Sequence, residues 1–492
     1  MKPATNKKIK KTVSIWVLGI VAVPLGFLFY TKIDANLFKD SYIDQIRSKG
    51  EITVLTRNAP TIMYEGRNGP EGLEYDLIKD FAEFIDVKIN FVVKPDTLSI
   101  LNSFRNGEGD LAAAGLTQTP EREAEFSFGP QYQTVRQQVV CRRGGVVPKN
   151  VTELNNVRLW VTAASSYAAS LQKIKKTDPN ISWNSTDAYD TEQLLKQVWD
   201  KKIDCTIADS NIVAINRRYF PELVIAFDIS EPEPHAWILP KGATEFQHVL
   251  NHWFTFYRSS GELEATLERN FGYIDSFDYV DTRHFKKQIR QRLPKYKKHF
   301  MNAGAKHNIP WTLIAAQSYQ ESHWRAKAKS PTGVRGIMML TLPTAREMGV
   351  KWRLNPRTSI YGGAKYLRKL MRKLPEEIKE PDRTWFALAA YNVGMGHIKD
   401  ARILAKEQGK NPNKWSDMAT VLPYLSQRKY FEKLKYGYAR GNEPVLYVKR
   451  IRNFQDILER EIELETRQTA GPETSKSPPS EGQLLQKTAF TQ

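Results

Sequence analysis

The chain has 492 residues, of which 41% are hydrophobic, and its formal net charge is +19. This length exceeds what one ordinary hydrophobic core organises, which excludes a single small domain and predicts two or three folded ones. The positive charge indicates an anionic partner, such as nucleic acid, a membrane surface or an acidic cell-wall polymer, and does not choose among them.

The amino-terminal segment, residues 1–35, predicts where the protein is located. Five lysines precede an uncharged apolar run, 13–30. This order predicts export, with the basic flank in the cytoplasm and everything after Asp34 translocated. The run is near the lower limit for spanning a bilayer and Ala35 is a weak cleavage site, so a retained anchor and a cleaved signal both stay open. Export removes nucleic acid from the expected partners and leaves the membrane and the cell wall.

Residues 41–270 alternate short β-rich runs with helical ones. The stretches 51–56 and 88–93 are typical of strands and 74–85 of a helix, and a second set of elements runs from 158 to 209. Such alternation predicts an α/β domain with a mostly parallel sheet. The two sets predict two lobes with a cleft between them.

The chain has two cysteines, Cys141 and Cys205, and eight histidines. An oxidising exported compartment permits the cysteines to pair, although the sequence does not show that they meet. No cysteine and histidine cluster has the spacing of metal ligands, so we predict no metal site and no cofactor.

Residues 271–464 are predominantly helical in pattern. They begin with a stretch, 283–300, that contains eight lysines and arginines and no acid, which we interpret as the solvated face of a linking helix rather than an anion-binding patch. The last segment, 465–492, is polar and rich in Pro, Ser, Thr and Gly, so we expect it to be disordered.

Glu321 is the first candidate catalytic residue. A helix capped by Asn308 places Leu313, Gln317 and Glu321 four residues apart, so the carboxylate projects from an aliphatic face. Desolvation and the negative end of the helix dipole both favour the protonated form, as a general acid requires. The alternative is a surface ion pair with Arg325, four residues further on.

The stretch 321–345 resembles the signature of the lysozyme-like lytic transglycosylases, in which a Glu-Ser pair ends a helix and a Gly-x-x-Gly turn leads to a Met-containing segment. The stretches 389–396 and 443–451 resemble two later blocks of that family. The matching residues within the first stretch are Ser330, Gly333, Gly336, Met338, Pro343, Thr344 and Ala345. The combination with an amino-terminal solute-binding-like domain is most similar to the membrane-bound lytic murein transglycosylase F branch.

This resemblance implies cleavage of the β-1,4 bond between N-acetylmuramic acid and N-acetylglucosamine in peptidoglycan, with a 1,6-anhydro product. Glu321 would be the acid and then the base. The resemblance also implies substrate-positioning roles for Ser322, Tyr391, Asn392 and Tyr447. Each of the four has a purely structural alternative, as a core aromatic, a helix-end cap or a solvated helix residue.

One position departs from the family pattern. Met339 stands where many members have glutamine. The change removes an amide that could hydrogen-bond the saccharide or the acid, although Met339 itself stays a candidate substrate contact.

The stretch 109–132 resembles the ligand-binding block of periplasmic amino-acid-binding proteins. The resemblance implies that Arg122, with Thr117 beside it, holds a ligand carboxylate, and that Asp209 receives an α-ammonium group. The implied ligand is a small zwitterion or a muropeptide that regulates the enzyme. The alternative is a surface pair of Arg122 with Glu121 or Glu125.

The sequence therefore predicts a two-lobed α/β domain, 41–270, followed by a mainly α lysozyme-like domain, 271–464. We expect a membrane-associated periplasmic lytic transglycosylase, at the outer membrane by resemblance and at the inner membrane if 13–30 is a retained anchor. Two other functions stay open at this point. One is a goose-type lysozyme, which hydrolyses the same bond, and the other is an envelope receptor or tether with a weak catalytic domain.

Overall fold

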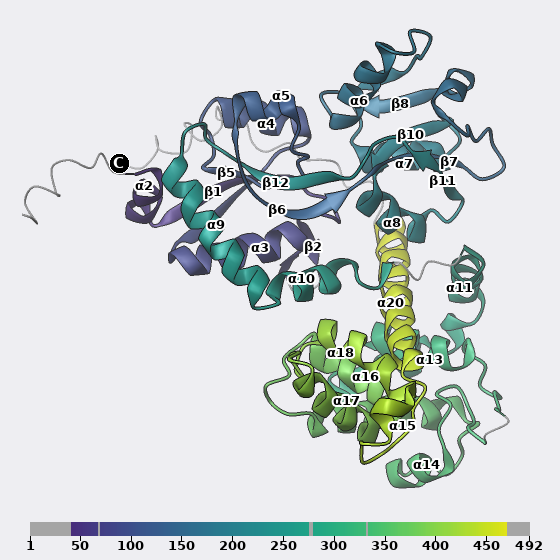
Figure 1. Ribbon diagram of the computed structural model, residues 1–492. Helices are drawn as coiled ribbons and strands as arrows, with labels where there is room; N and C mark the ends of the chain where they lie inside the picture. Colours follow the sequence, from purple (N-terminus) through teal and green to yellow (C-terminus); the bar gives the residue numbers. More distant parts are fainter. Residues whose placement is uncertain (1–40, 67–68, 275–278, 331–332, 470–492) are drawn as a thin grey trace, which may run out of the picture. The chain divides into compact units, whose positions relative to one another are not determined.

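The computed structural model describes residues 41–66, 69–274, 279–330 and 333–469 (Figure 1). The chain divides into two compact units. Unit 1 takes in the chain up to Thr134 together with Glu233–Ser259, and unit 2 takes in Val135–Pro232 together with everything from Ser260 onward. The predicted export segment and most of the predicted tail lie outside the described residues. In the part of the chain that is described, no helix is long and apolar enough to cross a membrane.

Unit 1 is built on a five-stranded sheet with the order β4-β1-β5-β12-β6. Its strand β1 pairs in parallel with β4 and β5, and β12 pairs antiparallel with β5. The β1 sequence EITVLT is buried almost throughout, as expected of a central parallel strand covered on both faces. The elements of unit 1 are α2 (Tyr42–Lys49), β1 (Glu51–Thr56), β2 (Tyr64–Gly66), β3 (Gly69–Glu71), α3 (Leu73–Ile85), β4 (Lys88–Val93), α4 (Thr97–Arg105), β5 (Leu111–Ala112), α5 (Pro120–Glu125), β6 (Ser127–Val135), β12 (Glu233–Leu239) and α9 (Thr244–Ser259).

The first part of unit 2 contains a second five-stranded sheet, with the order β11-β7-β10-β8-β9. Strand β8 is parallel to β9 and β10, whereas β7 is antiparallel to β10 and β11. The elements are β7 (Gln137–Arg142), η1 (Val151–Asn156), β8 (Leu159–Thr162), α6 (Ser166–Lys175), β9 (Asn184–Thr186), α7 (Thr191–Trp199), β10 (Cys205–Asp209), α8 (Ser210–Tyr219) and β11 (Leu223–Asp228). The expectation of a mostly parallel sheet therefore needs a correction at β7, because both of its pairings, with β10 and with β11, are antiparallel. The hydrophobic pattern that predicts a strand does not fix the direction in which it pairs.

Cys141 and Cys205 form a disulfide. They are register partners on the antiparallel strands β7 and β10. The pairing that the sequence left open is therefore settled by strand register.

The rest of unit 2 is helical. Its elements are α10 (Glu262–Phe271), α11 (Tyr279–Gln291), η3 (Leu293–Lys295), α12 (Lys297–His307), α13 (Trp311–Ser322), α14 (Leu342–Met348), α15 (Pro356–Lys373), α16 (Asp382–Val393), α17 (Met395–Glu407), α18 (Trp415–Val421), η4 (Leu422–Ser426), α19 (Arg428–Phe431) and α20 (Asn442–Thr469). Helix α13 is buried over most of its length and packs against α12. It also packs against the long helix α20 (Figure 1). The long helix α20 extends past residue 465, into the segment predicted to be disordered.

Side chains of α8 and α11 tie the sheet and the helical part of unit 2 to α20. Arg218 on α8 is only 2% exposed, and its guanidinium lies 2.5 Å from the Asp456 carboxylate on α20. Lys286, within the basic stretch 283–300, donates to the Tyr219 carbonyl and lies 2.8 Å from Glu461. The basic stretch is therefore not simply a solvated face, because part of it makes structural contacts.

Candidate active site

Helix α13 presents Glu321 at its carboxyl-terminal end. The residue before the helix is Pro310, and Asn308 instead ends α12 in the left-handed conformation, with φ of 51°. The predicted cap at Asn308 is therefore wrong, because asparagine tolerates the left-handed conformation that terminates a helix. Glu321 is half-buried, and Arg325 donates its Nε–H to the Ser322 carbonyl. The alternative of a Glu321–Arg325 ion pair is not seen.

The Glu321 carboxyl is tuned for proton transfer near neutral pH. Burial raises its pKa from 4.5 to about 7, against the lowering effect of a hydrogen bond from Tyr447. The Tyr447 hydroxyl donates to Oε1 of Glu321 at 2.5 Å. None of the described carboxylates contributes to this pKa shift, so burial rather than repulsion between acids is its cause. A carboxylic acid of this kind can donate a proton to a leaving oxygen.

A turn over residues 336–340 is held against α13 by hydroxyl groups. The hydroxyls of Ser318 and Ser322 both donate to the Ile337 carbonyl, at 3.0 and 2.8 Å. Gly336 begins the turn with φ of 88°, and a Cβ there would lie 1.8 Å from the Arg353 carbonyl oxygen. Only glycine fits this position, which explains the glycine before the Met-containing segment.

The same turn contains Met339, whose role toward a substrate stays a prediction. Met339 is half-buried and adopts a positive φ of 44°, which is rare for a side chain of its kind. The Tyr391 hydroxyl donates to the neighbouring Met338 carbonyl at 3.0 Å. Strained conformations of this kind cluster at functional sites, because the surrounding structure holds them in place.

The structure brings Tyr391 and Tyr447 together with Glu321. Burial, and then the nearby Glu321, raise the pKa of both tyrosines well above the usual value. Ser322 is buried and bonds backbone groups, whereas Asn392 is exposed at the penultimate position of α16. Their roles toward a substrate stay predictions.

Sequence reasoning assigned no role to Gln317 or Ser318. Gln317 is fully buried and donates to the Tyr447 hydroxyl at 3.2 Å, and Ser318 supports the 336–340 turn. The signal that could have found them is the same for both, namely a polar side chain on the buried side of the helix that presents Glu321.

The residues predicted to bind a zwitterion fall in different units. In unit 1, Thr117 is buried, and its carbonyl accepts a hydrogen bond from the Arg122 guanidinium at 2.8 Å. In unit 2, Asp209 is buried and precedes α8, and its backbone N–H donates to the Tyr167 hydroxyl.

Glu74 is a further buried acid of unit 1 that sequence reasoning missed. It accepts hydrogen bonds from the Gly115 N–H, the Trp237 indole and the Tyr132 hydroxyl. Burial raises its pKa, which those hydrogen bonds oppose. These three bonds fix Glu74 as a structural anchor of unit 1.

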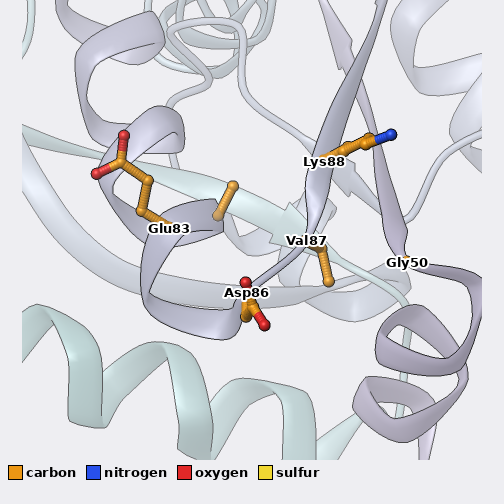
Figure 2. A pocket seen from close by; sticks show the side chains of 6 residues that line it. Gly50, Glu83, Asp86, Val87 and Lys88 are labelled. Atoms are coloured by element: carbon orange, nitrogen blue, oxygen red, sulfur yellow. The ribbon is translucent and has the colours of Figure 1, made fainter.

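A hollow of unit 1 lies where α3 ends and β4 begins. Figure 2 shows the Glu83 and Lys88 side chains on its rim pointing away from each other. Nothing in this arrangement converges on a ligand, and the hollow contains none of the predicted site residues. Within the described ranges, no group of three or more His, Cys, Asp or Glu side chains is placed to hold a metal ion.

Two protein families match separate parts of the chain. The bacterial extracellular solute-binding proteins, family 3, match residues 51–273, and the transglycosylase SLT domain matches residues 298–414. The fold and the site therefore define a class of protein in which a two-lobed solute-binding module precedes a transglycosylase domain.

Several relatives are similar to this chain along most of its length. Membrane-bound lytic murein transglycosylase F 1 of Alkalilimnicola ehrlichii is 43% identical over 466 residues, 93% of this chain and 94% of the relative. Membrane-bound lytic murein transglycosylase F of Saccharophagus degradans is 41% identical over 90% of this chain and 88% of the relative. Among solved structures, the P235GK mutant of ArgBP from T. maritima is 22% identical, with a TM-score of 0.43, over 47% of this chain and 99% of that one. The chain belongs to the membrane-bound lytic murein transglycosylase F family.

Proposed function

We propose that the chain is a lytic murein transglycosylase that cleaves the β-1,4 bond between N-acetylmuramic acid and N-acetylglucosamine without consuming water. The observation that carries this proposal is the single acid at the site. Glu321 has a pKa raised to about 7, and the described residues place no second carboxylate near enough to alter it. A common retaining hydrolase needs a second carboxylate about 5 Å away to act as nucleophile.

The reaction begins with protonated Glu321, which donates its proton to the glycosidic oxygen as positive charge develops on the muramoyl anomeric carbon. The bond from that carbon to the glycosidic oxygen breaks, and the N-acetylglucosamine portion leaves as the alcohol. Glu321, now a carboxylate, accepts the proton of the muramoyl carbon-6 hydroxyl. The carbon-6 oxygen bonds to the anomeric carbon, which closes the 1,6-anhydro ring and restores protonated Glu321.

The residues around Glu321 have distinct supporting roles in this proposal. Tyr447 holds Oε1 of Glu321 through its hydroxyl group, which leaves Oε2 to exchange the proton. Tyr391 and Ser322 hold the 336–340 turn through the Met338 and Ile337 carbonyls. That turn presents Met339 to the saccharide, and exposed Asn392 is placed to bind an N-acetyl group.

The domain that spans 41–270 binds a small ligand in this proposal. Arg122, whose position is fixed by its hydrogen bond to the Thr117 carbonyl, binds the ligand carboxylate with its planar set of donors. Asp209 binds the ammonium group. A free amino acid or the peptide of a muropeptide has both charges, and its binding regulates the enzyme domain, 271–464.

The names of the relatives support a membrane-bound protein of the cell envelope. We place the catalytic domain in the periplasm, at the outer membrane after cleavage of the export segment or at the inner membrane if residues 13–30 are retained. The positive charge suits anionic lipid headgroups and wall polymers.

The experiment that tests this function is the analysis of products released from purified murein sacculi. Anhydromuramic ends released by the chain, and not by its Glu321→Gln variant, support it. Reducing muramic ends would instead indicate a lysozyme.

A further inference from the structure

Gln317 is a buried polar residue in an apolar setting, one helical turn before Glu321 on α13. Its side chain has no exposed surface, and its neighbours Ala315 and Ala316 are equally buried. A buried amide is costly unless it is hydrogen-bonded, so its presence needs a specific partner. That partner is Tyr447 on α20, whose hydroxyl oxygen lies 3.2 Å from Nε2 of Gln317.

Three groups thus form one chain of hydrogen bonds. Nε2 of Gln317 donates to the Tyr447 hydroxyl, and that hydroxyl donates to Oε1 of Glu321. A tyrosine hydroxyl has a single proton, and an amide N–H can only donate. The amide therefore occupies the acceptor side of the hydroxyl and directs its proton toward Glu321.

The opposite order of donors would block catalysis. If an acceptor stood in place of Nε2, the Tyr447 hydroxyl could turn toward it, and protonated Glu321 could donate its own proton to the Tyr447 oxygen. The acidic proton would then point into the protein. With Nε2 in place, Oε1 of Glu321 is an acceptor, and the acidic proton is left on Oε2.

We propose that Gln317 is a positioning residue that sets the direction of the Tyr447 hydroxyl and thereby keeps the acidic proton of Glu321 on the oxygen that serves the substrate. This inference rests on the proposed acid role of Glu321 and adds to it a residue that acts only through Tyr447. Among the described residues, Tyr447 on α20 and Tyr391 on α16 are the titratable groups that act on or feel the Glu321 charge.

The test compares Gln317→Met, which keeps the length of the side chain and removes the donor, with the full chain. We expect a loss of about five- to tenfold in kcat, with KM nearly unchanged, because one neutral hydrogen bond is lost. The pKa of Glu321 should rise, because a hydroxyl that no longer accepts from Gln317 is a weaker donor to the carboxylate. Gln288→Met is the matched control, since Gln288 is a buried glutamine of α11 in the same unit. It should change neither kcat nor the Glu321 pKa.

A second readout does not depend on activity. The pKa of Glu321 is obtained from the difference in unfolding temperature between a protein and its Glu321→Gln variant, measured over a range of pH. This measurement is made once with Gln317 present and once with the Gln317→Met substitution. The shift caused by Gln317→Met should vanish in a Tyr447→Phe background, because Gln317 then has no hydroxyl to orient. The proposal would be overturned if Gln317→Met still shifted the Glu321 pKa in the Tyr447→Phe background, or if it shifted this pKa neither with Tyr447 present nor with phenylalanine in its place. Failure of the proposed function is distinguishable, since it would appear as Glu321→Gln retaining lytic activity.

Discussion

The Tyr447 hydroxyl donates a hydrogen bond to Oε1 of Glu321 across 126 residues of sequence. Glu321 lies in the last turn of α13 and Tyr447 in the first turns of α20, so the acid and its hydrogen-bond donor are brought together by the packing of two helices. Hydrogen bonding to the charged form of a carboxyl lowers its pKa, whereas burial raises it. The balance at Glu321 favours burial, which leaves a proton available near neutral pH.

Tyr447→Phe should lower the rate of murein cleavage by about tenfold and raise the pKa of Glu321. The hydrogen bond from Tyr447 lowers this pKa, so its removal lets burial act unopposed. The loss in rate follows from an acid whose orientation is no longer fixed. A pH profile of kcat measures both effects, and an alkaline limb that moves to lower pH would contradict the prediction.

The activity of the unmodified chain should fall as the pH rises through about 7, because Glu321 must be protonated to begin the reaction. The free energy of unfolding should also fall as the pH rises. The unfolded chain loses the Glu321 proton near the ordinary glutamate pKa of 4.5, and the folded chain keeps it until the pH reaches the raised pKa of about 7. Folding is therefore weakened relative to the Glu321→Gln variant as the pH rises through that interval, and the full difference is present above it. Unfolding temperatures of both proteins from pH 4 to pH 9, in roughly one-unit steps, measure this. A constant difference would show that the pKa is not raised.

Asp456→Ala should lower the free energy of unfolding of unit 2 by about 3 kcal/mol, because it leaves the Arg218 guanidinium buried without its carboxylate. It also removes the acceptor of the Tyr273 hydroxyl. Glu463→Ala is the control on the same helix, since Glu463 forms an exposed pair with Arg460, for which we expect less than about 0.5 kcal/mol. Denaturant unfolding distinguishes the two, and equal effects would mean that the Arg218 pair adds nothing beyond a surface contact.

Arg122→Ala should weaken binding of an amino acid or a wall stem peptide by about 10- to 100-fold, since a charge-assisted contact to the ligand carboxylate is lost. Calorimetry with a panel of L-amino acids and stem peptides measures this on the full chain. Arg105→Ala is the control, because Arg105 is an exposed arginine of unit 1 that pairs with Glu125. Ligands that bind the Arg122 variant as tightly as the unmodified chain would remove Arg122 from the ligand site.

Some of the site could be predicted from local sequence. The four-residue spacing that put Glu321 on an apolar face also implied its burial and its raised pKa, and both are found. The prediction that Asn308 begins a helix is wrong, because Asn308 ends α12 instead. Helix-end residues are ambiguous because asparagine suits both positions.

The parts that sequence could not provide are contacts between distant segments. Gln317 is separated from Tyr447 by 130 residues, and Arg218 from Asp456 by 238. Hydrophobic periodicity shows which face of a helix is buried, but it does not show which polar group of the neighbouring helix contacts that face. The pairing of Cys141 with Cys205 likewise depends on strand register, which the sequence alone left open.

The most direct test of the account is mass spectrometry of the muropeptides released from purified murein sacculi by the protein from Asn36 onward, beside its Glu321→Gln variant. We expect products with 1,6-anhydromuramic ends that are lost in the variant, while the variant keeps its fold. Reducing muramic ends would contradict the single-acid mechanism. Anhydro products that persist in the variant would show that another residue is the acid.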